Sequence, residues 1–271
     1  MEMNVKTSMK ISIITVSYNA VKTIEQTIQS VLSQTYDNIE YIIIDGGSTD
    51  GTVDVIKKYE DKIAHWISEP DTGIYNAMNK GIVLATGEFI YFIGADDWLY
   101  NDNVIADVIP WLNGNYDIVC GKVYLIDKQN KIKYLHGNKL SRNDVMVGKM
   151  APHQGMFTSK NIIIKFNEKY KVAADYEFFL KMVLEDSRVH FIDLIIANYD
   201  LSGISSIDYK TVTDEYSKII NEFLNEDFVK IYKKEHKRNK FKDILKNNLR
   251  KILFKLCIEK EIKKLKGWEK L

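Results

Sequence analysis

Two carboxylates stand side by side directly after a run of apolar, β-prone residues. The run is GEFIYFIGA at 87–95, and Asp96 and Asp97 follow it. Two adjacent negative charges repel each other, and a divalent cation removes that repulsion. Mg²⁺ and Mn²⁺ prefer oxygen ligands and are commonly held by one or two carboxylates together with substrate phosphates. The pair therefore indicates a cation site, where the cation would also neutralise a leaving diphosphate.

One alternative accounts for half of the pair. Asp96 is suited to cap a helix that begins near residue 101, because Asp accepts hydrogen bonds from the N–H groups at a helix start. That role leaves Asp97 without a use. Further acids follow two other apolar runs, Asp45 after one and Glu69 with Asp71 after the next. A single Asp at a strand end is unremarkable. Acids at three strand ends favour a ligand site, since ligands of open α/β sheets bind outside those ends.

The sequence around these acids alternates between strands and helices. Apolar β-branched runs predict strands buried on both faces, and apolar residues at helical spacing predict helices between them. The expected strands are 10–19, 39–45, 63–69 and 87–95, and the expected helices are 23–35, 53–60 and 74–85. Thr23 and Gln26 fit a capping box for the first helix. This order predicts an α/β fold with βαβ units, a Rossmann-like, mostly parallel sheet and helices on both faces.

The later part of the chain is less regular. We expect strands at 117–127 and 190–199, a helix at 174–185, and almost continuous helix from about 209. No linker rich in Pro or Gly divides 9–205, which indicates one large domain with an appendage.

Composition excludes several classes of protein. The 271 residues carry a formal net charge of +1, but residues 230–271 hold 16 Lys and Arg against five Asp and Glu. The two cysteines, Cys120 and Cys257, lie in apolar segments and indicate buried thiols in a reducing compartment, not a disulfide framework. No apolar stretch approaches the ~18 residues of a membrane-spanning helix. The run at 11–20 predicts a strand, not a signal peptide.

Six segments, in this order, resemble the family 2 inverting glycosyltransferases with a GT-A fold. They are ISIITVSYN, IIIDGGSTDGT, SEPDTGIYNAMNKGI, GEFIYFIGADD, HQGMF and ADYEFFLKM. The subgroup they resemble most is the bacterial enzymes that build exopolysaccharide, O-antigen and capsule repeat units. The resemblance implies a GT-A nucleotide-sugar transferase domain over 9–206 and leaves a helical, basic extension over 207–271.

The resemblance implies an enzyme that moves a hexosyl or hexosaminyl group from a nucleotide-sugar, with UDP as the expected nucleotide. The acceptor would be a hydroxyl of a glycan or lipid-linked sugar in cell-surface polysaccharide synthesis, and the cofactor a divalent cation, Mn²⁺ or Mg²⁺. The alternative is a non-catalytic GT-A-like module that binds nucleotide or lipid in a polysaccharide assembly. Such a module would be expected to have lost Asp97 or Asp175, and both are present. An NAD-dependent Rossmann enzyme lacks support, because no Gly-x-Gly-x-x-Gly follows the first strand.

The resemblance also implies roles for single residues. Asp97 would ligate the cation, and Asp45 would accept a hydrogen bond from a uracil ring. The residues implied for nucleotide binding are Thr15, Ser17, Asn19, Asp45, Asp71, Asn79 and Asp96. The family motif often reads Asp-x-Asp-Asp, and its first position here is Gly94. That departure bears on the number of protein ligands to the metal.

Asp175 matches the catalytic base of the family. Inverting transfer is a single displacement at the anomeric carbon, and it needs a base that accepts the proton of the acceptor hydroxyl. Such a base is typically worth ~10²–10⁴-fold, and a nearby carboxylate also favours an oxocarbenium-like transition state. Glu177 competes for this role, although positions i and i+2 of a helix do not share a face. The plain alternative for Asp175 is a helix N-cap.

Four residues are weaker candidates for an acceptor or diphosphate pocket: His153, Gln154, Gly203 and Ser205. His153 alone is equally well explained as a hydrogen-bonded, half-buried histidine. Gly203 and Ser205 belong to LSGISSIDY, and in similar enzymes the matching loop closes over the diphosphate.

The segment 241–267 has the pattern of a basic amphipathic helix. Apolar residues recur about one helical turn apart at Phe241, Leu245, Leu249, Ile252 and Leu256. Such helices bind anionic membrane surfaces, with ~1 kcal/mol of attraction per Lys or Arg. This pattern favours a cytoplasmic protein that is peripheral on the inner face of the cell membrane. The alternatives are a helix packed on its own domain and one that forms a homodimer. No motif that reads nucleic acid accompanies the charge.

Overall fold

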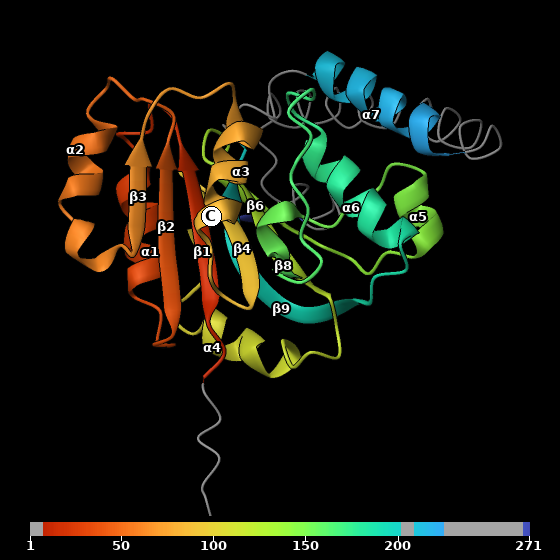
Figure 1. The fold of residues 1–271 in the computed structure, drawn as a ribbon, viewed down its shortest axis with the longest axis horizontal. Coiled ribbons are helices and arrows are strands. Elements are labelled where there is room, and N and C mark those ends of the chain that lie inside the picture. Colours follow the sequence, from red (N-terminus) through yellow and green to blue (C-terminus); the bar gives the residue numbers. More distant parts are fainter. Residues whose placement is uncertain (1–7, 202–208, 225–267) are drawn as a thin grey trace, which may run out of the picture.

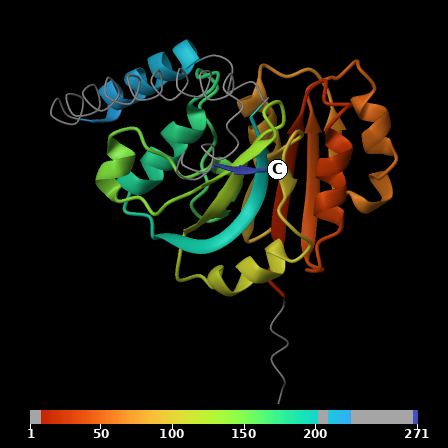
Figure 2. The ribbon, with the colours of Figure 1, turned by 180° about the vertical axis from the view of Figure 1, so that it is seen from behind.

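A computed structural model of the chain describes residues 8–201, 209–224 and 268–271. Its centre is one sheet with the strand order β10-β7-β6-β8-β4-β1-β2-β3, and β9 pairs with β5 and β6 beside this path. Helices cover both faces of the sheet, as Figure 1 and the reverse view in Figure 2 show. None of the described helices is long and apolar enough to cross a membrane.

The first half is a run of parallel strands joined by helices. Its elements are β1 (Ile11–Ser17), α1 (Ile24–Leu32), β2 (Ile39–Asp45), α2 (Thr52–Lys57), β3 (His65–Ser68), α3 (Ile74–Leu84) and β4 (Phe89–Gly94). β1 lies between β2 and β4, β3 pairs with β2, and all three pairings are parallel. The carboxyl ends of the four strands therefore meet at one edge of the sheet (Figure 1).

The second half is mostly antiparallel. Its elements are β5 (Trp98–Leu99), α4 (Val104–Val108), β6 (Ile118–Asp127), β7 (Ile132–His136), α5 (Arg142–Met146), β8 (Met156–Ser159), α6 (Ala174–Leu184), β9 (Val189–Asp200), α7 (Tyr209–Phe223) and β10 (Trp268–Lys270). β8 pairs antiparallel with β4 and β6, and β6 with β7. β6 and β9 are parallel. The mostly parallel sheet expected from the sequence is therefore mixed, because β8 lies antiparallel between β4 and β6, and β7 forms an antiparallel hairpin with β6.

Successive residues of the central strands enter two separate cores. Ile42 and Ile44 face one core, which includes apolar side chains of α3, α6 and α7. Tyr41 and Ile43 face the other, beneath α1, α2 and α4. This alternation follows from the two-residue period of a strand, and burial on both faces explains why these strands are apolar throughout.

Two local predictions are wrong. Thr23 is the N-cap residue of α1 but makes no side-chain cap, so the capping box is absent; its hydroxyl donates to the carbonyl of Ala20 instead. Almost continuous helix was expected after 209. α7 agrees with that expectation, but residues 268–270 form β10, which pairs antiparallel with β7.

The approach of α3 to β1 gives a test of this packing. A Cβ at Gly81 would stand 2.5 Å from Cγ2 of Ile14, a stiff, fully buried side chain. Gly81→Ala should therefore lower the free energy of unfolding by about 1–3 kcal/mol through overpacking, although Ala is the better helix former. Urea unfolding measures this. Val83→Ala, on an exposed position of the same helix, should change it by less than about 0.5 kcal/mol. Equal stability of the Gly81 variant and the wild type would contradict the packing.

Candidate active site

The carboxylate of Asp45 joins the ends of three strands. Its Oδ1 accepts hydrogen bonds from the hydroxyls of Ser17 (2.9 Å) and Ser48 (2.5 Å). Its Oδ2 accepts from the N–H groups of Gly47 (3.1 Å) and Ser48 (2.9 Å), and from the hydroxyl of Ser68 (2.7 Å). The side chain is fully buried. A carboxylate has about four lone-pair positions, so these five hydrogen bonds leave none for the uracil contact implied by the resemblance.

Few side-chain atoms at the end of β1 are accessible to a ligand. Thr15 is fully buried, and its hydroxyl lies 3.1 Å from that of Tyr41. Ser17 is 6% exposed and bound to the carboxylate described above. Asn19 is exposed, has a φ of +49°, and accepts a hydrogen bond from the N–H of Thr49 (3.0 Å). Of the three nucleotide contacts predicted here, the side chains of Thr15 and Ser17 point into the protein, and Asn19 alone faces outward.

Asp71 is a half-buried acid at the same edge. Its Oδ1 accepts from the N–H of Gly73 (2.8 Å). Gly46 has no side chain, and Oδ2 of Asp71 lies close against it, 2.5 Å from where a Cβ on Gly46 would stand. The ring of Tyr18 lies on the same spot, 3.4 Å from that Cβ position. Tyr18 is 64% exposed. Asp71 therefore fills the space beside the end of β2, next to an exposed aromatic ring. Within the described part of the chain, no donor binds its Oδ2.

The turn that carries the adjacent acids is fixed from two sides. The N–H of Asp97 donates to the carbonyl of Gly94 (3.1 Å), and the hydroxyl of Thr27 in α1 donates to the carbonyl of Asp97 (2.6 Å). A Cβ on Gly94 would stand 2.8 Å from Oδ1 of Asp96 and 3.0 Å from Oδ2 of Asp97. Both carboxylates thus fold over Gly94. A side chain at this position would require the two carboxylates to shift.

Burial of this pair makes two negative charges costly. Asp97 is 1% exposed, and its Oδ1 accepts from the N–H of Asp200 (2.9 Å). Burial, and then the charge of Asp96, raise the pKa of Asp97 well above its ordinary value. Burial also raises the pKa of Asp96. Lys128 forms an ion pair with Asp200 (2.7 Å) and supplies a positive charge nearby. The pair is stable as two anions only when a further positive charge lies close to it.

The donor set fits a hard divalent cation. Oxygens of Asp96 and Asp97 converge over Gly94, and carboxylate oxygens are the ligands that Mg²⁺ and Mn²⁺ prefer. The described residues hold no group of three or more His, Cys, Asp or Glu side chains that could bind a metal. A cation held here would therefore take its other ligands from phosphate oxygens and water, as Mg²⁺ commonly does.

The HQGMF segment lies beside the acid pair. The side chain of Gln154 donates a hydrogen bond to Asp97, and its carbonyl accepts from the hydroxyl of Tyr91 (2.8 Å). His153 packs against Phe92, with ring centroids 5.5 Å apart. Both nitrogens of His153 are buried, and neither has a partner among the described residues. Burial lowers the pKa of His153 to about 4, so this imidazole is neutral at pH 7, and the hydrogen-bonded histidine allowed by the sequence is wrong.

Asp175 lies in the first turn of α6. Its Oδ1 accepts from the hydroxyl of Tyr75 in α3 (3.2 Å) and from the N–H of Tyr176 (2.8 Å). The N-cap residue is Ala173, so the N-cap alternative for Asp175 is wrong. Burial raises the pKa of Asp175 to about 6. A base is most effective when its pKa lies near the working pH, and this value meets that condition.

Two other candidates make structural contacts. Glu177 is 2% exposed and pairs with Lys181 (3.1 Å). Asn79 is 5% exposed; its amide accepts from the N–H of Phe166 (2.7 Å) and donates to the carbonyl of Phe166 (2.9 Å) and to Glu168 (2.8 Å). Asn79 therefore fixes the loop before α6, and its polar atoms are not available to a nucleotide.

The sheet edge thus brings part of the predicted site together. Asn19, Asp71 and the Asp96–Asp97 pair follow the carboxyl ends of β1, β3 and β4. Gln154 contacts Asp97, and Asp175 meets Tyr75 at the start of α3, the helix that follows β3. Gly203, Ser205 and the segment 241–267 lie outside the described residues. Sequence reasoning missed Tyr75 and Asp200, which contact Asp175 and Asp97. Tyr75 belongs to a quoted motif, but an aromatic residue in a helix carries no signal of its own. The contact of Asp200 is made by its backbone N–H, which every residue except proline has, so no sequence pattern could have indicated it.

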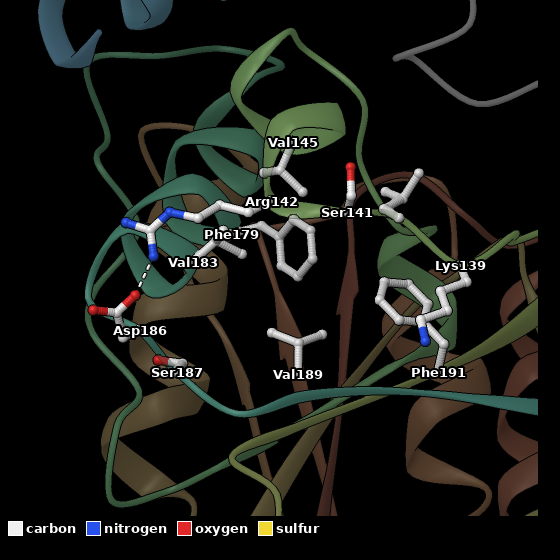
Figure 3. A pocket seen from close by; sticks show the side chains of 11 residues that line it. Lys139, Ser141, Arg142, Val145, Phe179, Val183, Asp186, Ser187, Val189 and Phe191 are labelled. Carbon is white, nitrogen blue, oxygen red and sulfur yellow. Dashed lines mark hydrogen bonds and ion pairs between the residues drawn. The ribbon is translucent and has the colours of Figure 1, made fainter.

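A pocket of about 250 Å³ is lined by residues of α5, α6 and β9 and of the segments next to them (Figure 3). Phe179 and Val183 of α6 line it, with Phe191 of β9, and Arg142 reaches Asp186 across its rim. Asp186 follows α6 by two residues, whereas Asp175 lies at the start of that helix. Phe179, which also lines the pocket, lies four residues after Asp175, about one helical turn along α6.

Comparison with known proteins decides the family. The family model described as Glycosyl transferase family 2 matches residues 12–185. The chain belongs to this family. It is a glycosyltransferase, and its α/β architecture is of the GT-A type. The match includes the acid pair and Asp175 and ends before β9 and α7.

Curated relatives carry the same general description. An uncharacterized glycosyltransferase of Mycobacterium tuberculosis is 32% identical over 202 residues, which cover 72% of this chain and 77% of the relative. A PGL/p-HBAD biosynthesis glycosyltransferase of Mycobacterium bovis is 27% identical over 205 residues, with 72% and 78% covered.

Solved structures share the fold. TarS of Staphylococcus aureus superposes with a TM-score of 0.64 at 19% identity; the match covers 82% of this chain but 41% of TarS. TarS 1–349 in complex with UDP-GlcNAc has a TM-score of 0.63 at 20% identity, with 78% and 64% covered. The mannosyltransferase PcManGT of Pyrobaculum calidifontis, in complex with GDP-Man and Mn²⁺, has a TM-score of 0.53 at 17% identity, with 70% and 57% covered.

The two acids at the strand ends should differ in their effect on stability. Asp45→Asn places an amide N–H₂ among five donors and should lower the free energy of unfolding by about 1–3 kcal/mol. Asp71→Asn keeps an oxygen that accepts from Gly73, so its stability should stay within about 0.5 kcal/mol of the wild type. Urea unfolding of both variants measures this. A larger loss in the Asp71 variant would contradict the assignment of Asp45 as the structural acid.

Proposed function

We propose that this transferase moves a sugar from a UDP-sugar, with inversion at the anomeric carbon, to a hydroxyl of a glycan or lipid-linked acceptor in cell-surface polysaccharide synthesis. The observation that carries the proposal is the position of Asp175. Its half-buried carboxyl, with a pKa of about 6, meets Tyr75 at the start of α3, the helix that follows β3, and the buried pair of acids follows β4 at the same sheet edge. A single-displacement transfer needs both parts, a base for the acceptor and a site for the leaving diphosphate.

Asp175 accepts the proton of the acceptor hydroxyl in this proposal. The hydroxyl of Tyr75 donates to Oδ1 of Asp175 and so orients the carboxylate. Oδ2 has no hydrogen bond from the described residues in this arrangement, and it is the oxygen that would meet the acceptor. A base positioned in this way contributes typically 10²–10⁴-fold, as an order of magnitude.

The acid pair holds a divalent cation, Mn²⁺ or Mg²⁺, in the same proposal. Asp97 is the principal ligand in this proposal. Backbone hydrogen bonds with Gly94 and with the hydroxyl of Thr27 fix the turn that carries its carboxylate. The bound cation supplies charge neutralisation at the leaving diphosphate. Mn²⁺ in the related mannosyltransferase structure supports this assignment. Gln154 orients the Asp97 carboxylate by its hydrogen bond.

Asp71 replaces Asp45 as the acid that contacts the nucleotide base. Asp45 has no open lone pair, whereas Oδ2 of Asp71 is open on the same edge. The exposed ring of Tyr18 stands beside it and offers an apolar face to a planar base. UDP and UDP-GlcNAc in complexes of TarS support uridine as the nucleoside.

The acceptor and the place of action rest on the sequence pattern alone. A lipid-linked acceptor on the cytoplasmic leaflet agrees with the basic pattern of 241–267, which would bind the anionic inner face of the membrane. Packing of this segment on its own domain and homodimer formation stay as alternatives. The non-catalytic module considered from the sequence gains no support, since the family match and the relatives describe enzymes.

Metal-dependent nucleotide binding is the first prediction. Calorimetric titration should show that UDP binds the wild type, that Mn²⁺ strengthens binding, and that Asp97→Ala removes the effect of Mn²⁺. Gly94→Ala should weaken the affinity for Mn²⁺ by about 10- to 100-fold, because the added methyl group would displace the two carboxylates, and misoriented ligands cost about this much at metal sites. Asp61→Ala, at an exposed position without a described contact, is the matched control. Absence of UDP binding with and without Mn²⁺ would refute the nucleotide site.

The pH dependence of transfer is the second prediction. Because Asp175 acts as a base only when deprotonated, kcat should be level above its pKa and fall about tenfold per pH unit below pH 6. Asp175→Asn should lower kcat by about 10²–10⁴-fold and leave the affinity for UDP unchanged. Transfer assays from pH 4.5 to 8.5 measure both effects. A kcat that stays level down to pH 4.5 would exclude Asp175 as the base.

A further inference from the structure

Three consecutive backbone N–H groups before α6 converge on one carboxylate. Lys171 donates to Oε1 of Glu215 (2.8 Å), and Val172 (3.0 Å) and Ala173 (3.1 Å) donate to its Oε2. Glu215 belongs to α7, 42 to 44 residues further along the chain, and is 7% exposed. α6 has no side-chain cap of its own. A carboxylate near a helix start is favourable, because the N–H groups there lack partners and carry partial positive charge.

α7 is packed firmly over this helix start. Ile219 and Ile220 are fully buried in the core that also contains α6. The rings of Tyr176 and Tyr216 stack with centroids 4.3 Å apart and an interplanar angle of 7°. Tyr216 follows Glu215, and Tyr176 follows Asp175, so the stacked rings join the two segments that carry these acids. Figure 1 shows α7 beside α6.

We propose that Glu215 is a positioning residue for the catalytic base: by holding residues 171–173, it sets the place and orientation of Asp175 at the start of α6. The proposal rests on the proposed function, in which Asp175 is the base. It extends the active site beyond the part of the chain that the family model matches, since that match ends at residue 185. The first turn of α6 is held from α3 by Tyr75 and from α7 by Glu215.

Among the groups around Asp175, Glu215 is the acid whose negative charge affects the pKa of Asp175. From α3, Tyr75 presents a hydroxyl. On its own helix, Glu177 is neutralised by Lys181 (3.1 Å). From α7, the negative charge of Glu215 raises the pKa of Asp175, in addition to the larger effect of burial. Removal of that charge should therefore move the acid limb of the pH profile of kcat to lower pH.

The chain offers a matched control on the same helix. Glu222 is two turns further along α7 and also contacts the loop before α6, through Lys169 (3.1 Å) and the hydroxyl of Tyr170 (3.3 Å). These partners are side chains, and the Glu222 side chain is 50% exposed. Glu222→Gln thus perturbs the docking of α7 without removing the backbone hydrogen bonds that precede Asp175.

The experiment compares Glu215→Gln with Glu222→Gln in transfer assays over pH. Gln preserves the volume, but its single carbonyl oxygen cannot accept from three donors. Glu215→Gln should lower kcat by about 10- to 100-fold through misplacement of the base, keep the KM for the UDP-sugar within about twofold, and move the acid limb to lower pH. Glu222→Gln should leave all three quantities near the wild type. An unchanged kcat and acid limb in Glu215→Gln, or the same change in both variants, would overturn the proposal.

Hydrogen exchange gives a readout that does not depend on activity. Glu215→Gln should speed exchange of the amides of residues 171–173, and Glu222→Gln should not. Calorimetry with UDP verifies that each variant is folded. If Glu215→Gln does not fold, Glu215→Asp replaces it, because the shorter carboxylate keeps its charge but cannot reach all three donors. That variant should show the faster exchange and lower kcat, with the acid limb unchanged; wild-type exchange and kcat would overturn the proposal.

Failure of the proposed function would appear differently. In that case the wild type would not transfer sugar from UDP-sugars, or Asp175→Asn would remain active. The exchange rates at 171–173 would still report on Glu215. Slow exchange in Glu215→Gln would then exclude the positioning role independently of any reaction.

Discussion

The central strands are covered on both faces, and this constraint decides where chemistry can take place. β1, β2 and β4 send alternate side chains into two separate cores, so a polar group within a strand has no access to solvent or substrate. Thr15 illustrates this, since its side chain is fully buried and its hydroxyl is hydrogen-bonded to that of Tyr41. Reactive side chains must therefore stand at strand ends, where Asp45, Asp71 and the Asp96–Asp97 pair are found.

At that edge, similar residues perform different tasks because their surroundings differ. Asp45 is surrounded by donors and holds three strand ends together. The Asp96–Asp97 pair is buried, and burial raises the pKa of both carboxyls, so a nearby positive charge would stabilise the pair as anions. Burial raises the pKa of Asp175, and its carboxylate accepts hydrogen bonds from the hydroxyl of Tyr75 and the N–H of Tyr176. The edge thus combines one structural acid with the cation site and the base that we propose.

The elements from β1 to β4 could be predicted from the sequence, as could β6, α6 and β9, because two-residue and helical periodicities are local. The short elements β5, β7, α5 and β8 were not predicted. The role of each acid was only partly predictable. Asp45 and Asp71 look alike in a sequence, and only the fold tells which one is saturated by donors. Thr15 and Asn79 were assigned to the nucleotide from their place in motifs. The hydrogen-bond partner of Thr15 is in β2, however, and that of Asn79 is in the loop before α6. The contacts of Glu215 are 42 to 44 residues away, and no local pattern announces them.

The end of the family match at residue 185 has a consequence for how this enzyme can be divided. β9 lies after that point, yet it pairs with β6 from Ile118 to Ile126 and with β5 at Trp98 and Leu99. It also brings the N–H of Asp200 to Asp97. A chain shortened to the matched segment would expose an unpaired edge of β6, which is a template for aggregation. The unit that can be inherited, fused or exchanged as a whole is therefore longer than the segment by which the family is recognised.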